Sequence, residues 1–151
     1  MNENIIGREQ ELNILDRILS SNESEFVAIY GRRRVGKTFL IREYFEEQMV
    51  FYHTGIANVS QKEELKAFAH ALTRYGGNTT DTIEDWIDAF EQLALYIDSL
   101  PNGRKVIFLD ELPWMDEKGQ GVIPALEHFW NSYASLRKDI ILVVCGSATS
   151  W

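Results

Sequence analysis

Short, unbroken runs of hydrophobic residues recur along the chain, and polar residues or glycines bound each of them. The runs span Phe26–Tyr30, Met49–His53, Val106–Leu109 and Ile140–Cys145. They show little alternation of apolar and polar positions, which is typical of parallel strands that are buried on both faces of a sheet. We therefore predict four buried strands.

The segments between these runs carry hydrophobic residues at every third or fourth position, which indicates helices with one apolar face. In chain order, these apolar positions are Leu12, Leu15, Ile18 and Leu19; Phe39, Leu40, Ile41, Tyr44 and Phe45; Leu65, Phe68, Ala69 and Leu72; Trp86, Phe90, Leu93 and Ile97; and Leu126, Phe129, Trp130, Tyr133 and Leu136. The pattern predicts five helices, and the second of them is expected to run to about Glu47.

Capping signals place the ends of several helices. Ser60 and Glu63 form a capping box, and Gly76-Gly77 ends the helix that follows. Thr82 is expected to open the next helix, and Pro124 suits the first turn of the last one. Because strands alternate with helices, we predict an α/β fold with a parallel sheet, helices on both faces and right-handed crossovers.

Length and composition limit the possible classes of protein. The 151 residues suit a single core domain, residues 1–151, in which residues 1–24 supply an N-terminal helix and a linker. We find no apolar run of about 20 residues, so we expect no membrane span. A single cysteine, Cys145, rules out an internal disulfide and suits a reducing cytoplasm. The net charge of −8 argues against a broad nucleic-acid-binding surface on this part of the protein.

The most informative motif is Gly31-Arg32-Arg33-Arg34-Val35-Gly36-Lys37-Thr38, which fits the P-loop pattern G-x-x-x-x-G-K-[ST]. It follows a predicted strand and opens a predicted helix at Phe39, which is the setting that a P-loop requires. The glycines let backbone N–H groups wrap a phosphate, and Lys37 adds a positive charge. The Thr38 hydroxyl is a suitable ligand for Mg²⁺. The three arginines contact phosphates or a partner, or they are solvated loop charges, and the sequence leaves this open.

Polar residues at the ends of the other predicted strands are the remaining candidates. Asp110 has the position of a Walker B aspartate that holds Mg²⁺ together with Thr38, and Glu111 is placed to orient an attacking water. Ser147 or Thr149 would contact the γ-phosphate or else serve as a turn hydroxyl. His53 lies either near the site or at a polar strand end where its hydrogen bonds are satisfied. Trp114 and Trp130 are better explained as packing residues than as a platform for bases.

Taken together, these motifs resemble those of P-loop ATPases of the AAA+/STAND grouping, and more narrowly the archaeal-type ATPase family. The motifs are Gly7-Arg8-Glu9-Gln10-Glu11-Leu12, the P-loop with Tyr30, Leu109-Asp110-Glu111-Leu112-Pro113-Trp114-Met115, and Cys145-Gly146-Ser147-Ala148-Thr149-Ser150-Trp151. The resemblance implies a three-layer P-loop NTPase fold in which the second, third, fourth and first strands follow one another across the sheet.

The same resemblance assigns roles to residues. Nucleotide phosphates would lie on residues 31–38 and Phe39, and the region of Gly7 and Arg8 would lie near the adenine. Asp110 would handle Mg²⁺, Lys37 and Glu111 would act in catalysis, and Ser147 would occupy the sensor position. The cofactors implied are ATP and Mg²⁺.

Members of this family continue beyond the fourth strand, so we expect this chain to be the N-terminal part of a longer protein. On this view the fifth strand and the lid are missing, and the first strand is an open edge. We therefore expect self-association or marginal stability of this piece. A C-terminal domain like a nuclease, common in the family, would provide contact with nucleic acid.

Three functions remain in competition at this point. The leading one is Mg²⁺-dependent ATP hydrolysis coupled to a conformational change in a larger protein. The second is a signalling or assembly switch that binds nucleotide and rarely hydrolyses it. The third, a small-molecule kinase, needs an acceptor pocket and a basic lid, and neither is evident from the sequence.

Overall fold

The computed structural model describes residues 9–31, 36–77, 83–116, 119 and 121–147. Within them, four parallel strands form one sheet in the order β1-β4-β3-β2. The strands are β1 (Glu25–Gly31), β2 (Met49–Thr54), β3 (Lys105–Asp110) and β4 (Ile140–Ser147). This confirms both the four predicted strands and their predicted order.

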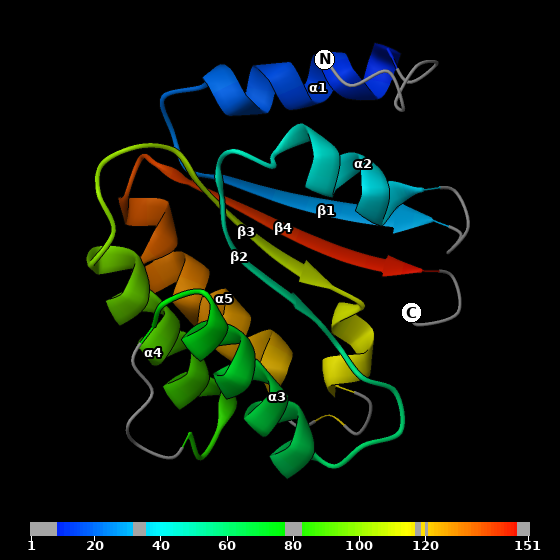
Figure 1. Ribbon diagram of the computed structural model, residues 1–151, viewed down its shortest axis with the longest axis vertical. Coiled ribbons are helices and arrows are strands. Elements are labelled where there is room, and N and C mark those ends of the chain that lie inside the picture. Colours follow the sequence, from blue (N-terminus) through cyan, green and yellow to red (C-terminus); the bar gives the residue numbers. More distant parts are fainter. Residues whose placement is uncertain (1–8, 32–35, 78–82, 117–118, 120, 148–151) are drawn as a thin grey trace.

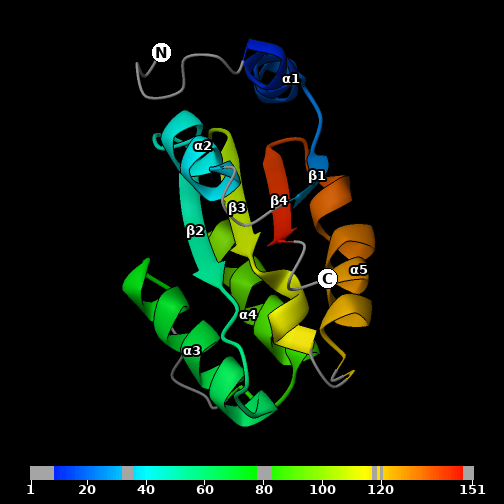
Figure 2. The same ribbon diagram turned by 90° about the vertical axis from the view of Figure 1, so that its right-hand side faces the viewer.

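Helices cover both faces of the sheet, as Figures 1 and 2 show from two directions. The α-helices are α1 (Glu9–Ser20), α2 (Lys37–Tyr44), α3 (Gln61–Arg74), α4 (Trp86–Asp98) and α5 (Val122–Ser132). Two short 3₁₀ helices, η3 (Leu112–Asp116) and η4 (Ala134–Leu136), flank α5 in the sequence. Helices α1 and α2 lie on one face, and α3, α4 and α5 lie on the other. The fold is the expected three-layer α/β arrangement.

The sheet divides the hydrophobic core in two, because alternate residues of each strand point to opposite faces. Val106 and Phe108 of β3 pack with buried residues of α1 and α2. Ile107 and Leu109, the alternate positions of β3, pack with α3, α4 and α5. Every residue of β3 is buried. This two-sided burial explains why the strands read as continuous hydrophobic runs.

Three predicted helix boundaries were wrong: the start of α4 and the ends of α2 and α5. Helix α4 begins after Asp85, whose carboxylate accepts a hydrogen bond from the Asp88 backbone at 2.8 Å; Thr82 lies outside the described residues. Helix α2 ends at Tyr44 and not near Glu47.

The last α-helix also ends earlier than the hydrophobic pattern suggests. The backbone of Tyr133 leaves helical geometry, with φ −135° and ψ −66°. The 3₁₀ turn that follows leaves Leu136 76% exposed, although its spacing had predicted burial. In contrast, the predicted capping box at Ser60 and Glu63 is present.

At the amino ends of the strands, Arg104 fastens α1 to the sheet. Its guanidinium donates to the carbonyl oxygens of Ile18, Leu19, Glu23 and Lys138 and to the Ser21 hydroxyl, at 2.8–3.2 Å. These five contacts use all five N–H groups of an arginine. The carboxyl ends of the strands lie at the opposite end of the sheet. Parallel α/β sheets bind ligands at that end. No helix among the described residues is long and apolar enough to cross a membrane.

Candidate functional site

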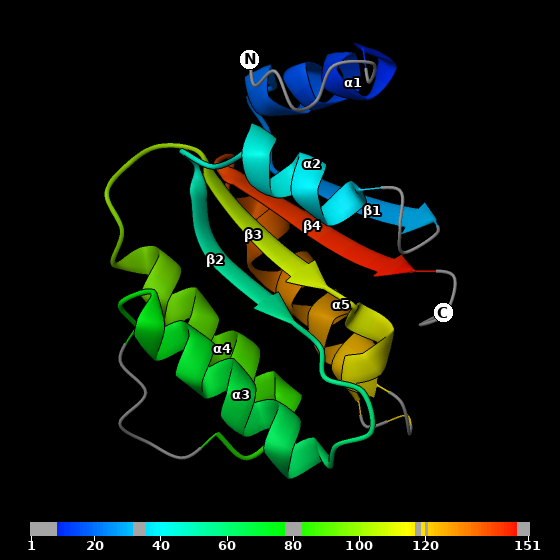
Figure 3. The same ribbon diagram turned by 45° about the vertical axis from the view of Figure 1, so that its right-hand side comes forward.

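All four strands run in the same direction, so their carboxyl ends meet at one edge of the sheet (Figure 3). The pairing register sets Gly31 beside Ser147 and Thr54 beside Asp110 at this edge. In parallel α/β sheets, ligands bind outside this edge. The candidate residues from three separate motifs are thus brought to one end of the molecule.

Gly36 forms the junction between the loop and α2. Its φ of 76° and ψ of 23° lie in the left-handed region, where a side chain is unfavourable and glycine is not. Its carbonyl oxygen accepts the hydrogen bond from the Leu40 backbone at 2.9 Å, which starts the helix. The second glycine of the P-loop pattern is therefore needed for the backbone to turn into α2, whose positive end faces the strand ends.

The central contact of the site joins the P-loop helix to β3. The Thr38 hydroxyl donates a hydrogen bond to Asp110 Oδ2 at 2.8 Å, across 72 positions of sequence. Asp110 is only 6% exposed. The two residues predicted to share a metal ion are thus in direct contact.

The other contacts of Asp110 fix its carboxylate. Oδ1 accepts a hydrogen bond from the Glu111 backbone at 2.9 Å. Oδ2 lies 3.4 Å from the Tyr52 hydroxyl of β2. Burial, reinforced by the charge of Asp110, raises the pKa of Tyr52 to about 12, so its hydroxyl keeps its proton at neutral pH.

Glu111 has an unusual backbone for a residue with a side chain. Its φ is 52°, in the left-handed region that only a few per cent of non-glycine residues adopt. Its Oε2 is buried and has no hydrogen-bond partner among the described residues. Backbone strain and an unpaired buried oxygen are features that cluster at functional sites.

Gly55 holds the turn that contains Glu111. Its N–H donates to the Asp110 carbonyl oxygen at 2.9 Å, which extends the pairing of β2 and β3 past the strand ends. A Cβ at this position would stand 2.4 Å from the Glu111 carbonyl oxygen and 2.9 Å from Met115 Cγ. Only glycine allows this close approach.

Several predicted site residues lie partly or wholly outside what the structure describes. Gly7, Arg8, Arg32, Arg33, Arg34, Val35 and Thr149 are outside the described residues. For Lys37 and Ser147 the backbone is described, at the start of α2 and the end of β4, but the side chain is not. Their predicted roles stay predictions.

His53 lies on the opposite face of the sheet from Asp110. Its ring packs edge-on against Phe68, with ring centroids 5.4 Å apart, and its Nε2 has no partner among the described residues. Burial, with a smaller effect of the Arg74 charge, lowers the pKa of His53 to about 4. His53 is therefore a buried, neutral residue of the core. It lies outside the candidate site, and the prediction that its hydrogen bonds would be satisfied at the strand end was wrong.

A groove of about 570 Å³ lies between α2, the start of β2 and the end of α3. It is lined by Thr38, Phe39, Arg42, Glu43, Glu46, Met49 and Tyr75. Phe39, predicted to contact the nucleotide, is 42% exposed and lines this groove. Arg42, one helical turn after Thr38, lies over the Tyr52 ring at 5.1 Å from its centroid.

The residues present suit Mg²⁺. This cation prefers hard oxygen ligands and is usually held by one or two protein groups together with phosphate oxygens and water. The Thr38 hydroxyl at the start of α2 and the buried Asp110 carboxylate at the end of β3, 2.8 Å apart, provide such ligands.

Tyr52 and Gly55 were given no role from the sequence, although both contact the Asp110-Glu111 segment. The sequence showed a polar end to the second strand but not its register against the third. Once Thr54 is known to lie beside Asp110, the alternation of side chains puts Tyr52 on the same face as Asp110. The missing information was therefore long-range pairing.

The chain is similar to known proteins in sequence and in fold. A curated but uncharacterised protein of Methanocaldococcus jannaschii is 31% identical over 145 residues, which are 96% of this chain and 30% of the relative. The Walker-type ATPase of Pyrococcus abyssi has a TM-score of 0.65 at 20% identity, covering 96% of this chain and 46% of that one. A Drosophila origin recognition complex structure bound to DNA has a TM-score of 0.61 at 16% identity, with 95% and 38% covered.

The chain thus spans less than half the length of each of these proteins, and the two structural similarities establish the fold alone. The family assignment comes from a sequence model that matches residues 5–151, nearly the whole chain. The chain belongs to the family of ATPase domains found predominantly in Archaea.

Proposed function

We propose that this domain binds ATP together with Mg²⁺, hydrolyses the β–γ bond and changes the conformation of a larger multidomain protein. The observation that carries the proposal is the 2.8 Å contact between the Thr38 hydroxyl and Asp110 Oδ2. It joins the P-loop helix to the end of β3, where a metal ion could be held by both residues. Membership of the ATPase family supports ATP as the nucleotide.

Each residue has a distinct part in this proposal. The loop from Gly31 to Gly36 and the start of α2 would bind phosphates through backbone N–H groups, and Lys37 would add a positive charge. Thr38 and Asp110 would hold Mg²⁺, which supplies positive charge to the β- and γ-phosphates. Glu111 would orient a water molecule and accept its proton, and Ser147 would contact the γ-phosphate from β4.

A nucleotide-dependent switch with little hydrolysis is the second candidate. It is favoured by the buried position of Glu111 Oε2, which has no partner among the described residues and would have to move to meet a solvent water. In that case the strained Glu111 backbone would belong to a resting conformation. Turnover in the full-length protein separates the two functions.

We further propose that contact with nucleic acid involves a region of the protein beyond this domain. The net charge of −8 makes this domain a poor polyanion surface. The structurally similar origin recognition complex is bound to DNA, but at 16% identity that property belongs to that protein.

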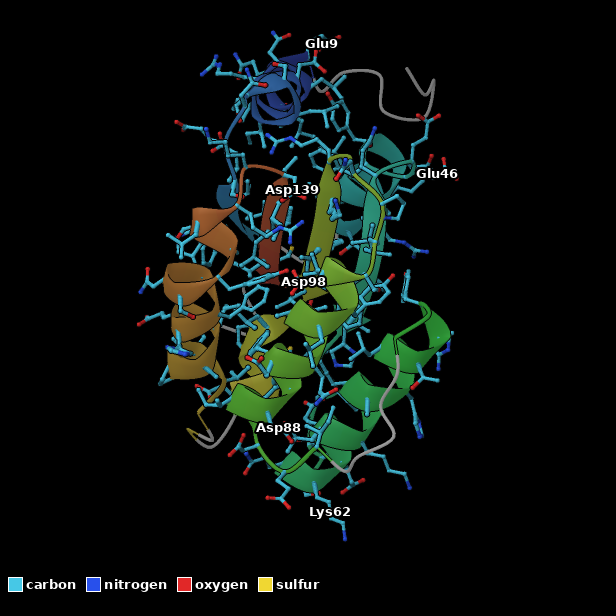
Figure 4. The ribbon with its side chains drawn as sticks, turned by 90° about the vertical axis from the view of Figure 1, so that its left-hand side faces the viewer. Glu9, Glu46, Lys62, Asp88, Asp98 and Asp139 are labelled. Atoms are coloured by element: carbon cyan, nitrogen blue, oxygen red, sulfur yellow. The ribbon has the colours of Figure 1, made fainter. Side chains whose placement is uncertain are left out.

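The test of ATP binding uses Lys37→Ala in the full-length protein, with Lys62→Ala as the control. Lys62 is an exposed lysine at the start of α3, which packs on the opposite face of the sheet from α2, and Figure 4 labels it. Removing a charge-assisted phosphate contact should weaken Mg-ATP binding about 100-fold, or roughly 3 kcal/mol, in titration calorimetry. The control should bind like the wild type. Equal affinities for all three proteins would reject the P-loop assignment.

A further inference from the structure

Asp110 Oδ2 is shared by two hydroxyl groups from different elements. The Thr38 hydroxyl of α2 lies 2.8 Å from it, and the Tyr52 hydroxyl of β2 lies 3.4 Å from it. The first distance is that of a normal O–H···O hydrogen bond, and the second is long. Thr38 is therefore the main donor in this arrangement, and Tyr52 is close enough to become one.

A metal ion at Thr38 and Asp110 would need the Asp110 carboxylate held in one position. The Thr38 oxygen would meet the cation with a lone pair and keep its proton for Asp110, because a hydroxyl offers one donor and two acceptor positions. A carboxylate that is only 6% exposed is costly to leave without partners. Tyr52 is the remaining hydroxyl donor described at this oxygen.

The Tyr52 ring is held from the side of α2. The Arg42 guanidinium lies 5.1 Å from the ring centroid, within the range of a cation–π contact. Phe108, its neighbour on β3, packs against the same ring at 5.2 Å between centroids. Because the ring has a contact on each of these elements, its hydroxyl oxygen is held within reach of Asp110.

We propose that Tyr52 is a positioning residue for the metal site: its hydroxyl, together with that of Thr38, holds the Asp110 carboxylate in place for the cation. The inference rests on the proposed function, because it needs a metal ion at Thr38 and Asp110. It adds a residue of β2 that supports the carboxylate without touching the nucleotide. Loss of such support around metal ligands typically lowers metal affinity 10- to 100-fold.

The experiment measures how much Mg²⁺ the full-length protein needs to bind ATP. Tyr52→Phe removes the hydroxyl and keeps the ring. The matched control is Tyr44→Phe, which removes a hydroxyl that donates to Asp16, a carboxylate of α1. ATP affinity is titrated at a series of Mg²⁺ concentrations and in EDTA, and the melting temperature is recorded in EDTA.

We expect Tyr52→Phe to raise the half-saturating Mg²⁺ concentration about 10-fold and to leave ATP affinity in EDTA unchanged. Tyr44→Phe should match the wild type in both. An unchanged Mg²⁺ requirement in Tyr52→Phe would overturn the inference. An equal loss of ATP affinity with Mg²⁺ and in EDTA would also overturn it, because that result indicates a structural role for the hydroxyl. Absence of Mg²⁺-dependent ATP binding in the wild type would instead reject the proposed function, and this inference with it.

If Tyr52→Phe does not fold, Arg42→Gln carries the test, because it releases the ring and leaves both hydroxyls in place. It should raise the Mg²⁺ requirement in the same direction by a smaller factor. A requirement equal to that of the wild type would overturn the inference.

Discussion

Gly55 and Glu111 lie so close that a Cβ on Gly55 would stand 2.4 Å from the Glu111 carbonyl oxygen. The end of β2 therefore sets the position of the turn that follows β3. That turn carries Glu111, whose φ of 52° is itself unfavourable. The contact between the two strand ends is the structural reason that this turn can be held.

Gly55→Ala should disturb this turn. The added methyl meets backbone on one side and Met115 on the other, so the turn must shift. We expect a loss of about 1–3 kcal/mol in the free energy of unfolding and a fall in ATP turnover of roughly 10-fold or more. Steady-state phosphate release and chemical denaturation of the full-length protein measure both.

Gly119→Ala is the matched control for this prediction. Gly119 has a φ of +62°, but a Cβ there would meet no atom of the described residues within 4 Å. It should cost about 1 kcal/mol of stability through backbone strain alone and leave turnover unchanged. Wild-type turnover in Gly55→Ala would show that the close approach does not position Glu111.

The two adjacent carboxylates should respond differently to neutralisation. Glu111→Gln keeps the size of the side chain but loses the base, so Mg-ATP should bind about as well as to the wild type while turnover falls roughly 100-fold. Asp110→Asn weakens the proposed metal site, so both binding and turnover should fall. Phosphate release beside nucleotide affinity tests this, and a wild-type rate in Glu111→Gln would favour the switch.

The strands could be predicted because their burial is two-sided. Ile140, Ile141, Leu142 and Val143 all point into one core or the other, so the sequence shows an unbroken apolar run. The capping box at Ser60 was equally visible, because both of its hydrogen bonds lie within three residues. Local signals of this kind are complete in the sequence.

The end of α5 and the surroundings of Asp110 could not be predicted in this way. The apolar spacing continues to Leu136, but the Tyr133 hydroxyl bonds to Asp98 at 2.6 Å, on α4, and the backbone leaves the helix there. Tyr52 and Asp110 are 58 positions apart, and only the pairing of β2 with β3 brings them together. Both features depend on tertiary contacts that no sequence period encodes.

His53 should make stability depend on pH between about 6.5 and 4. In the unfolded chain a histidine takes up its proton near pH 6.5, whereas burial lowers the pKa of His53 to about 4 in the folded protein. The unfolded state therefore binds more protons in this window, and stability is lost as pH falls through it. Above about pH 6.5 the neutral form is present in both states and this loss is absent.

His53→Phe should flatten this part of the curve of unfolding free energy against pH. The variant replaces the imidazole with a ring that also suits the contact with Phe68. Urea denaturation at pH 7.5, 6, 5 and 4.5 measures the slope. A slope equal to that of the wild type would show that His53 does not become charged on unfolding in this range.

A second group of charges should act at lower pH, at the amino ends of the strands. Asp139 accepts hydrogen bonds from Arg137 at 2.7 Å and from the buried Lys105 at 2.8 Å. The Arg137 hydrogen bonds, followed by Lys105, hold the pKa of Asp139 well below its usual range against the opposing effect of burial. Its contribution is present above about pH 4 and is lost as pH falls through the depressed pKa.

Asp139→Asn should cost about 3 kcal/mol or more at pH 7, because the Lys105 ammonium, 2% exposed, loses its carboxylate. Asp98→Asn is the control, because Asp98 also pairs with Arg137 but is 53% exposed. Figure 4 labels Asp98 and Asp139. The control should cost about 1 kcal/mol or less. Equal losses for the two variants in denaturant unfolding would mean that burial of Lys105 adds nothing.

The two edges of the sheet should differ in their tendency to bind another chain. The edge strand β2 has an irregular register between Met49 and Phe51, and the Tyr96 hydroxyl lies 2.8 Å from the Val50 carbonyl oxygen. The other edge strand, β1, pairs with β4 in regular register throughout, and no described strand pairs with its outer side. Regular, uncovered edges invite pairing with another strand.

The 151-residue chain by itself should therefore associate through β1. Phe26 of β1 is 39% exposed and packs edge-on against Trp130 at 5.3 Å between ring centroids, which leaves apolar surface beside the open edge. Phe26→Lys should shift the chain towards monomer in light scattering at tens of micromolar protein, because a charge on an edge strand opposes pairing. Ile87→Lys, on α4, changes an equally apolar residue that is 51% exposed and should leave association as in the wild type. A wild-type chain that is a monodisperse monomer with a high melting temperature would contradict the prediction. Equal effects of Phe26→Lys and Ile87→Lys would mean that general surface charge, and not the β1 edge, controls association.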